Sequence, residues 1–401
     1  MNLILFDDKS RIHLLPLTYT RPCADLRIGI LTIREKWEKY LKAQTSTLTE
    51  PYLQKKFPMQ KGSDNLLING RVLPNSTLIK GLEALQSGQA LMGENGILLG
   101  VRMEQEQLDV FQSDSSGFNT VNFSGDALII NYPWDLFAKN AEALEADFDL
   151  ITAGRKSQPL SPTNTLLGNR IFLEEGAYAE CAVFNSTTGA IYLGKDSEVM
   201  EGSVVRGGLA LCEHAALKLS TKIYGATTVG PHSKVGGEVN NSVITGYSNK
   251  GHDGFLGNSV LGEWCNLGAD TNNSNLKNNY AEVKLWSYAR NGFARTGLQF
   301  CGLIMGDHSK SGINTMFNTG TVVGVSANIF GSGFPRNFIP SFSWGGAQGF
   351  ETFALKKADE VAEKMMARRG IEYNETEKAI LQHLFETSSE YRIWEKENAL
   401  N

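Results

Sequence analysis

Residues 193–235 read LGKDSEVMEGSVVRGGLALCEHAALKLSTKIYGATTVGPHSKV, and an aliphatic side chain returns at every sixth position of this stretch. The eight positions are Leu193, Val199, Val205, Leu211, Leu217, Ile223, Val229 and Val235. A second register, four residues after each of these, is mostly Ser, Thr or Ala. It comprises Ser197, Ser203, Leu209, Ala215, Thr221, Thr227, Ser233 and Val239. A short fixed period of this kind is the signature of a repeat fold.

A period of six has a direct physical interpretation. Each hexad supplies one short strand and one tight corner, three hexads close a triangular coil, and the coils stack at the strand spacing of about 4.8 Å. The aliphatic residue points into the prism and the small residue lies at the turn. We therefore predict a left-handed parallel β-helix, stabilised by stacking neighbouring coils. The pattern returns downstream with one lapse at Ser311, and its positions there are Met305, Phe317, Val323 and Ile329.

The glycines support this prediction. The chain has 401 residues with 41 glycines and only 11 prolines, and 30 of the glycines lie between residues 151 and 350. Glycine serves corners that need a positive φ, and proline cannot donate to the ladder between coils.

Charge and cysteine content exclude several classes of protein. The net charge is −5 and no stripe of lysine and arginine is present, which argues against a nucleic-acid partner. Five scattered cysteines without a C-x-x-C pair indicate reduced thiols in a cytoplasmic protein. No apolar stretch approaches the length of a membrane span, and no cluster of ligands indicates a metal site.

The regions that flank the repeat have a different pattern. We predict an α/β domain at 1–155, the β-helix at 156–350 and C-terminal helices at 351–401. The first domain is expected to contain strands at 3–6, 66–68 and 127–130 and amphipathic helices at 27–42 and 133–148. Two charged amphipathic segments, 351–369 and 376–397, predict a helical cap or an oligomer contact.

The hexad rhythm lapses between about 240 and 300, where a repeat protein often carries its function. The run Ser248-Asn249-Lys250-Gly251-His252 is followed by Phe255-Leu256-Gly257 and then by Asn266-Leu267-Gly268-Ala269 with Thr271 and Asn275. This segment resembles the acetyltransferase half of bifunctional N-acetylglucosamine-1-phosphate uridyltransferases. The family pattern has lysine where Asn249 stands, tyrosine for Phe255 and aspartate for Asn258. It has glycine for Asp270 and tyrosine for Leu276.

The resemblance implies acetyl transfer from acetyl-CoA to the amine of glucosamine 1-phosphate. An amine must lose a proton to attack, and histidine has the pKa that suits a general base near neutral pH. His252 is therefore the predicted catalytic base, with Glu238 as a candidate to orient its ring. The predicted substrate-binding residues are Glu238, Lys250, Asn266, Asn275 and Lys277.

The N-terminal segment LFDDKSRIHLLPLT, residues 5–18, resembles the opening of sugar nucleotidyltransferases, in which a strand leads to a Gly-rich loop and then to Pro-Leu-Thr. Here aspartates occupy that loop, and they would repel phosphate. The predicted nucleotide-binding residues are Arg11, Arg21, Lys36 and Asn69, where Asn69 stands in place of the metal-binding aspartate of the family. Mg²⁺ is expected if this site is active.

The combined expectation is an enzyme that makes UDP-N-acetylglucosamine from a sugar phosphate, acetyl-CoA and a nucleoside triphosphate. The resemblance also implies a homotrimer. Two alternatives remain open: an enzyme with one of the two activities, or a non-catalytic β-helix subunit that senses nucleotide sugars.

Overall fold

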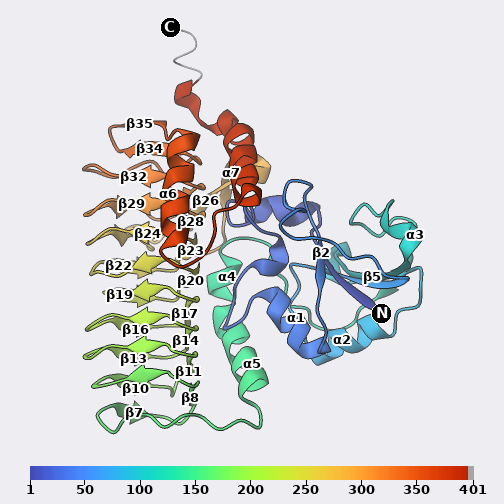
Figure 1. Cartoon of the computed structure of the whole chain (residues 1–401), viewed down its shortest axis with the longest axis horizontal. Coiled ribbons are helices and arrows are strands. Elements are labelled where there is room, and N and C mark those ends of the chain that lie inside the picture. The colour runs from blue at the N-terminus through green and yellow to red at the C-terminus, as the bar shows by residue number, and fades with distance from the viewer. Residues whose placement is uncertain (396–401) are drawn as a thin grey trace. The chain divides into compact units, whose positions relative to one another are not determined.

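The computed structural model describes residues 1–395, which fall into two compact units. The first consists of Met1–Leu14, Thr20–Leu26 and Leu31–Tyr132, and the second of Leu15–Tyr19, Arg27–Ile30 and the chain from Pro133 onward. Figure 1 colours the chain from the N-terminus in blue to the C-terminus in red.

The first unit is built on a six-stranded mixed sheet with the strand order β2-β1-β3-β5-β4-β6. Its strands are β1 (Asn2–Phe6), β2 (Ser46–Leu48), β3 (Asp64–Asn69), β4 (Gln89–Met92), β5 (Leu98–Glu104) and β6 (Asn119–Asn122). Its α-helices are α1 (Ile33–Leu41), α2 (Ser76–Glu83) and α3 (Gln105–Leu108). The apolar faces of β1, β3 and β5 form a buried core, as the strand predictions at 3–6 and 66–68 require. The α/β class of this region is confirmed.

Three predicted elements of this region differ in the structure. The helix expected at 133–148 is divided into α4 (Asp135–Ala138) and α5 (Asn140–Thr152). The helix expected at 27–42 begins only at Ile33, because Thr32 and Glu35 form a capping box that starts α1 there. Gly29, at φ +69°, keeps the preceding residues out of the helix. The strand expected at 127–130 forms a single isolated bridge between Ile129 and Val72. Backbone hydrogen bonds join this segment to Leu73 and Arg71, but it does not enter a ladder.

The second unit contains a parallel β-solenoid of about ten coils, which confirms the predicted repeat fold. One sheet has β7 (Thr165–Leu167), β10 (Val183–Asn185), β13 (Val204–Arg206), β16 (Lys222–Tyr224), β19 (Glu238–Asn240) and β22 (Phe255–Gly257). The next has β8 (Ile171–Leu173), β11 (Ile191–Leu193), β14 (Leu209–Leu211), β17 (Thr227–Val229), β20 (Val243–Gly246), β23 (Val260–Glu263), β28 (Leu303–Met305), β31 (Thr321–Val323) and β33 (Phe338–Ile339). The third has β9 (Tyr178–Ala179), β12 (Glu198–Val199), β15 (Ala216–Leu217), β18 (Lys234–Val235), β21 (Asn249–Lys250), β24 (Asn266–Leu267), β29 (Lys310–Ser311), β32 (Asn328–Ile329), β34 (Ser343–Gly346) and β35 (Gly349–Thr352).

The aliphatic register predicted from the hexads forms the core of the solenoid. All eight positions from Leu193 to Val235 are buried in one cluster, and Met305, Phe317, Val323 and Ile329 continue it. The lapse at Ser311 is also an inward position, because Ser311 is buried and its hydroxyl hydrogen-bonds to Thr271.

The first part of the irregular stretch, up to β24, keeps the solenoid but changes the length of its coils. Val204 pairs with Lys222, eighteen residues later, whereas Lys234 pairs with Asn249, fifteen residues later. The chain leaves the coils later, near the antiparallel hairpin of β26 (Lys284–Ser287) and β27 (Gly292–Arg295). A short pair, β25 (Asn272–Asn273) with β30 (Met316–Phe317), joins the coils on either side of that excursion.

Helices α4 (Asp135–Ala138) and α5 (Asn140–Thr152) belong to the solenoid unit, and Asn140 donates to the Ala226 carbonyl at 2.9 Å. The C-terminal helices are α6 (Leu355–Ala367) and α7 (Glu375–Thr387). In Figure 1 α6 runs beside the orange and yellow coils of the solenoid. Helix α6 is shorter than the predicted segment 351–369, because residues 349–352 form β35. The predicted end of the second helical segment, at 397, lies outside the described residues.

None of the helices in residues 1–395 is long and apolar enough to cross a membrane.

Candidate active site in the solenoid

His252 lies at a corner of the solenoid, directly after β21, and its side chain is exposed. It lines a pocket with a volume of about 530 Å³, together with Asn249 and Asn266 from two adjacent strands. The apolar lining comes from Leu267, Ala269, Ile313 and Met365. A histidine and two amide side chains thus face one cavity. Of the predicted site residues, His252 and Asn266 are brought together here.

Four cationic side chains line the same pocket. Lys218 and Lys234 come from neighbouring coils of the solenoid, and Arg368 and Arg369 come from the end of α6. Among the described residues, no aspartate or glutamate lines this pocket. The cavity is therefore suited to an anionic ligand.

Lys250 lies beneath the His252 corner and points into the solenoid. It pairs with Val235, in the register where the preceding coils have aliphatic residues, and only 2% of it is exposed. Its Nζ donates to the carbonyl of Gly236 at 2.9 Å and to the carbonyl of His252 at 2.6 Å. Burial lowers the pKa of Lys250 to about 8, and Asp253 and Asp270 oppose that shift. Lys250 thus holds the backbone of His252 and does not line the pocket.

The corner itself depends on glycine at position 254. Gly254 has a φ of +117°, and a Cβ there would lie 2.3 Å from the Thr271 carbonyl oxygen. Neither the dihedral angle nor the space admits another residue. The turn that presents His252 is therefore fixed by the sequence around it.

A ladder of stacked rings runs along a neighbouring corner of the solenoid. His214, His232, Tyr247 and Trp264 stack with centroid separations of 4.7, 4.9 and 4.4 Å, and His308 follows at 6.2 Å. All five residues have a positive φ, so successive coils place their rings in the same position. Tyr247 and Trp264 also line the pocket of His252. The stacked side chains of Tyr247 and Trp264 thus form part of the pocket wall.

The other predicted substrate residues lie elsewhere. Glu238 lines a second pocket on another sheet, and its carboxylate accepts a hydrogen bond from Tyr224 at 2.5 Å. Asn275 donates to the Asn258 side chain, and Lys277 donates to the Glu282 carbonyl. None of these three side chains lines the pocket of His252.

The sequence reasoning missed several lining residues. These are Lys218, Lys234, Tyr247, Trp264, Arg368 and Arg369. The coil register of Lys234, which pairs with Asn249, could have identified it. Nothing in the repeat indicates where α6 lies, so Arg368 and Arg369 needed the tertiary structure.

The predicted nucleotide loop in the first unit is closed by ion pairs. Arg71, 2% exposed, binds both carboxylate oxygens of Asp8 at 3.0 and 2.6 Å. Arg11 pairs with Asp7 at 3.3 Å and donates to the Tyr52 hydroxyl at 2.9 Å. Asp7 also accepts from the Cys23 amide and the Thr49 hydroxyl, and burial raises the pKa of Asp7. The aspartates that replace the glycines are thus held by arginines of the same unit.

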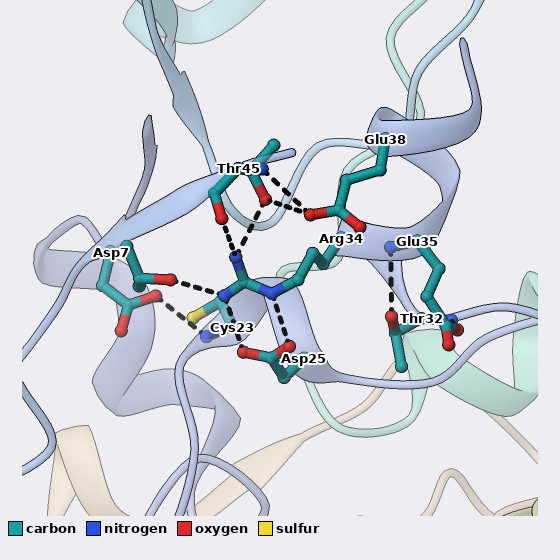
Figure 2. Close-up of polar contacts among 9 residues, drawn as sticks. Asp7, Cys23, Asp25, Thr32, Arg34, Glu35, Glu38 and Thr45 are labelled. Carbon is teal, nitrogen blue, oxygen red and sulfur yellow. Dashed lines mark hydrogen bonds and ion pairs between the residues drawn. The ribbon is translucent and has the colours of Figure 1, made fainter. Parts of the chain in front are cut away.

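Figure 2 shows the polar contacts beside this loop. Arg34 binds both carboxylate oxygens of Asp25 at 2.7 and 2.9 Å and donates to Thr45, which is itself bound by Glu38. These contacts tie α1 to the segments around Cys23 and β2. The predicted residues Arg21 and Lys36 are both buried within the unit.

Asn69 does not offer an oxygen to a metal. Its Nδ2 donates to Asp8 and to the Leu98 carbonyl, both at 2.9 Å, and its Oδ1 accepts from the Arg71 amide. Mg²⁺ is bound through carboxylates with free oxygens, and those of Asp8 are engaged by Arg71. These residues do not fit a magnesium site in this arrangement. Across the described chain, no group of three or more His, Cys, Asp or Glu residues is placed to hold a metal.

Comparisons with known proteins agree with the resemblance seen in the sequence. Residues 3–156 match the family model described as sugar nucleotidyl transferase. A bifunctional sugar-1-phosphate nucleotidylyltransferase/acetyltransferase from Sulfurisphaera tokodaii is 27% identical over 144 residues, which is 35% of this chain and 35% of that protein. The match thus spans about a third of the length of the curated relative. Residues 3–156 are thus similar to sugar nucleotidyl transferases, and about a third of the chain is similar to part of a two-activity enzyme.

Proposed function

We propose that this chain, whose first 156 residues match sugar nucleotidyl transferases, acetylates an amino-sugar 1-phosphate in its solenoid and transfers a uridylyl group in its N-terminal unit. The proposed acyl acceptor is glucosamine 1-phosphate, the donor is acetyl-CoA, and the final product is UDP-N-acetylglucosamine. The family match supports sugar-phosphate chemistry, and the motif around His252 supports the acyl transfer. The resemblance further implies a homotrimer, which we include in the proposal.

The observation that carries the proposal is His252 on a cationic pocket. Both substrates of the acyl transfer carry phosphate, and the pocket has four cations and no carboxylate among its described lining residues. The exposed imidazole needs no opening motion to meet a substrate amine. A general base placed in such a site is worth roughly 10² to 10⁴ in rate.

In the proposed reaction, His252 accepts a proton from the amine as its nitrogen attacks the thioester carbonyl carbon. The C–S bond then breaks, and the proton passes to the departing thiolate. Asn249 and Asn266 line the same pocket, and in this proposal their amides donate to substrate oxygens. Lys250 keeps the backbone of His252 in place through its 2.6 Å hydrogen bond.

The experiment for the acyl transfer follows the free thiol released from acetyl-CoA with glucosamine 1-phosphate. We expect turnover by the wild type and a loss of roughly 10²-fold or more in kcat for His252→Ala. His383→Ala is the matched control, because His383 lies on α7 and does not line the pocket. Absence of thiol release by the wild type, or full activity of His252→Ala, would disprove this half of the proposal.

A second candidate function is acyl transfer alone. It is favoured by the ion pairs of Asp7 and Asp8, which occupy the loop where nucleotidyltransferases hold phosphate. Release of pyrophosphate from UTP and a sugar 1-phosphate separates the two candidates. Pyrophosphate release supports the two-activity enzyme, and its absence with normal thiol release supports acyl transfer alone.

A further inference from the structure

The end of α6 forms one wall of the pocket of His252. Met365, Arg368 and Arg369 line the cavity, and Arg368 is the C-cap of the helix. The Arg369 guanidinium donates to the carbonyl of His232 at 3.2 Å, which ties the helix end to the ring ladder of the solenoid. The C-terminal segment is therefore more than a cap on the last coil.

The charge of this pocket differs from that of the whole chain. The protein has 43 acidic and 38 basic residues, yet the pocket collects Lys218, Lys234, Arg368 and Arg369 without a carboxylate. Within residues 1–395, none of these four side chains forms an ion pair with an acidic residue. Four cations that converge on one cavity repel each other unless an anion lies between them.

We propose that Arg368 and Arg369 of α6, together with Lys218 and Lys234, bind the phosphates at the nucleotide end of the acyl donor. This inference rests on the proposed function for the identity of the donor as an acyl-coenzyme A. The helical tail then serves as a phosphate-binding element of the acyltransferase site. The acyl end of the donor lies toward His252, at the other part of the same lining.

The amount of charge favours the donor over the acceptor. A diphosphate and a ribose phosphate give coenzyme A about four negative charges at neutral pH, whereas a sugar 1-phosphate has about two. The four positive charges of the pocket match the charge of coenzyme A. Arginine also binds phosphate through two parallel hydrogen bonds, which makes it suitable for a diphosphate. The same lining also contains the amides of Asn249 and Asn266 and apolar side chains, which suit the amide-containing pantetheine arm.

A purely structural explanation accounts for only part of the cluster. Cations at the C-terminus of a helix are stabilised by its dipole, which would suffice for Arg368 and Arg369. The dipole of α6 does not explain the positions of Lys218 and Lys234, which lie on two neighbouring coils of the solenoid and line the same cavity. A shared anionic ligand explains all four positions.

The test measures binding of coenzyme A to the full chain by titration calorimetry. The variant Arg368→Gln/Arg369→Gln removes two charges from the pocket. Lys356→Gln/Lys357→Gln removes two charges from exposed positions at the other end of α6 and is the matched control. Pantetheine, which lacks the nucleotide and its phosphates, is the second probe. The variant Lys218→Gln/Lys234→Gln tests the cluster without altering the helix.

We expect both pocket variants to bind coenzyme A at least about tenfold more weakly, with pantetheine affinity unchanged and the control like the wild type. Added salt should weaken binding by the wild type more than by the variants. Unchanged affinity for coenzyme A in folded pocket variants, or a wild type that does not bind it, overturns the inference. A loss of affinity confined to the sugar 1-phosphate also overturns the inference. Normal binding of coenzyme A without thiol release would instead contradict the proposed acceptor and leave this inference standing.

Discussion

At the scale of the residue, Lys250 is a buried charge that holds a corner of the solenoid through its hydrogen bonds. An aliphatic side chain in this inward register would be cheaper to bury, because an ammonium loses its hydration. The lysine instead donates to two carbonyls, one of them that of His252. Lys310, on a later coil, makes a similar contact with the His308 carbonyl at 2.7 Å, and burial lowers its pKa to about 8 as well.

We expect Lys250→Met to fold with a free energy of unfolding within about 1 kcal/mol of the wild type, because relief from burying the charge offsets the lost hydrogen bonds. Its kcat should nevertheless fall at least about tenfold, since a small misplacement of a catalytic group is costly. Urea denaturation and the thiol assay measure the two effects. Lys310→Met is the control and should keep its activity. A Lys250→Met protein with wild-type kcat would show that this hydrogen bond does not position His252.

The same residue predicts a dependence of stability on pH. The pKa of Lys250 is about 8 in the folded protein and about 10.4 in an unfolded chain, so the unfolded state binds more protons between these values. Burying the charged ammonium of Lys250 therefore lowers the stability of the folded state by its full amount below pH 8. This loss of stability disappears as the pH rises toward 10.4. Relative to Lys250→Met, the wild type should gain on the order of 3 kcal/mol across this window. A constant difference between the two proteins from pH 8 to 10.4 would contradict the lowered pKa.

At the scale of the element, some glycines of the coils are required because the backbones of adjacent coils approach closely there. A Cβ at Gly230 would lie 1.9 Å from the Thr245 carbonyl oxygen, whereas one at Gly246, on the next coil, would lie 3.5 Å from its nearest neighbour. The sequence alone does not distinguish these two glycines, but only Gly230 lies where a side chain would collide with the next coil.

Gly230→Ala should therefore lower the free energy of unfolding by about 3 kcal/mol or more, because backbone must move to admit the methyl group. Gly246→Ala should change it by less than about 1 kcal/mol. Thermal melts followed by circular dichroism compare the two variants with the wild type. Equal melting temperatures for both would mean that the coil spacing relaxes freely at this corner.

At the scale of the whole molecule, the two proposed activities belong to two compact units that share no site residue. The acyl site uses His252 and its pocket, and the nucleotide loop lies with Asp7, Asp8 and Arg71 in the first unit.

His252→Ala should consequently lower thiol release roughly 10²-fold or more, while pyrophosphate release from UTP and a sugar 1-phosphate stays within about twofold of the wild type, because His252 is not part of the nucleotide loop. Both rates are measured on the same preparation. Parallel loss of both activities in a protein with an unchanged melting temperature would indicate that the sites depend on each other.

The sequence by itself determined the solenoid, because a period of six is a local property of the chain and each hexad makes the same strand and corner. It also identified the corner of His252, because the motif and Gly254 act within a few residues of each other. The sequence offers Glu238 only as a candidate to orient the ring of His252. In the structure Glu238 lies on β19, in a different sheet from β21, and its carboxylate accepts a hydrogen bond from Tyr224.

Only the tertiary structure decided which distant residues complete each site. The approach of α6 to the pocket depends on packing between segments more than a hundred residues apart, which no periodicity encodes. The pairing of Asp8 with Arg71 is likewise a contact across 63 residues. It explains how a loop of aspartates can occupy the place of a Gly-rich loop, because burial of an ion pair depends on the fold around it. Local pattern thus fixed the scaffold, and long-range packing fixed the charges that the scaffold presents.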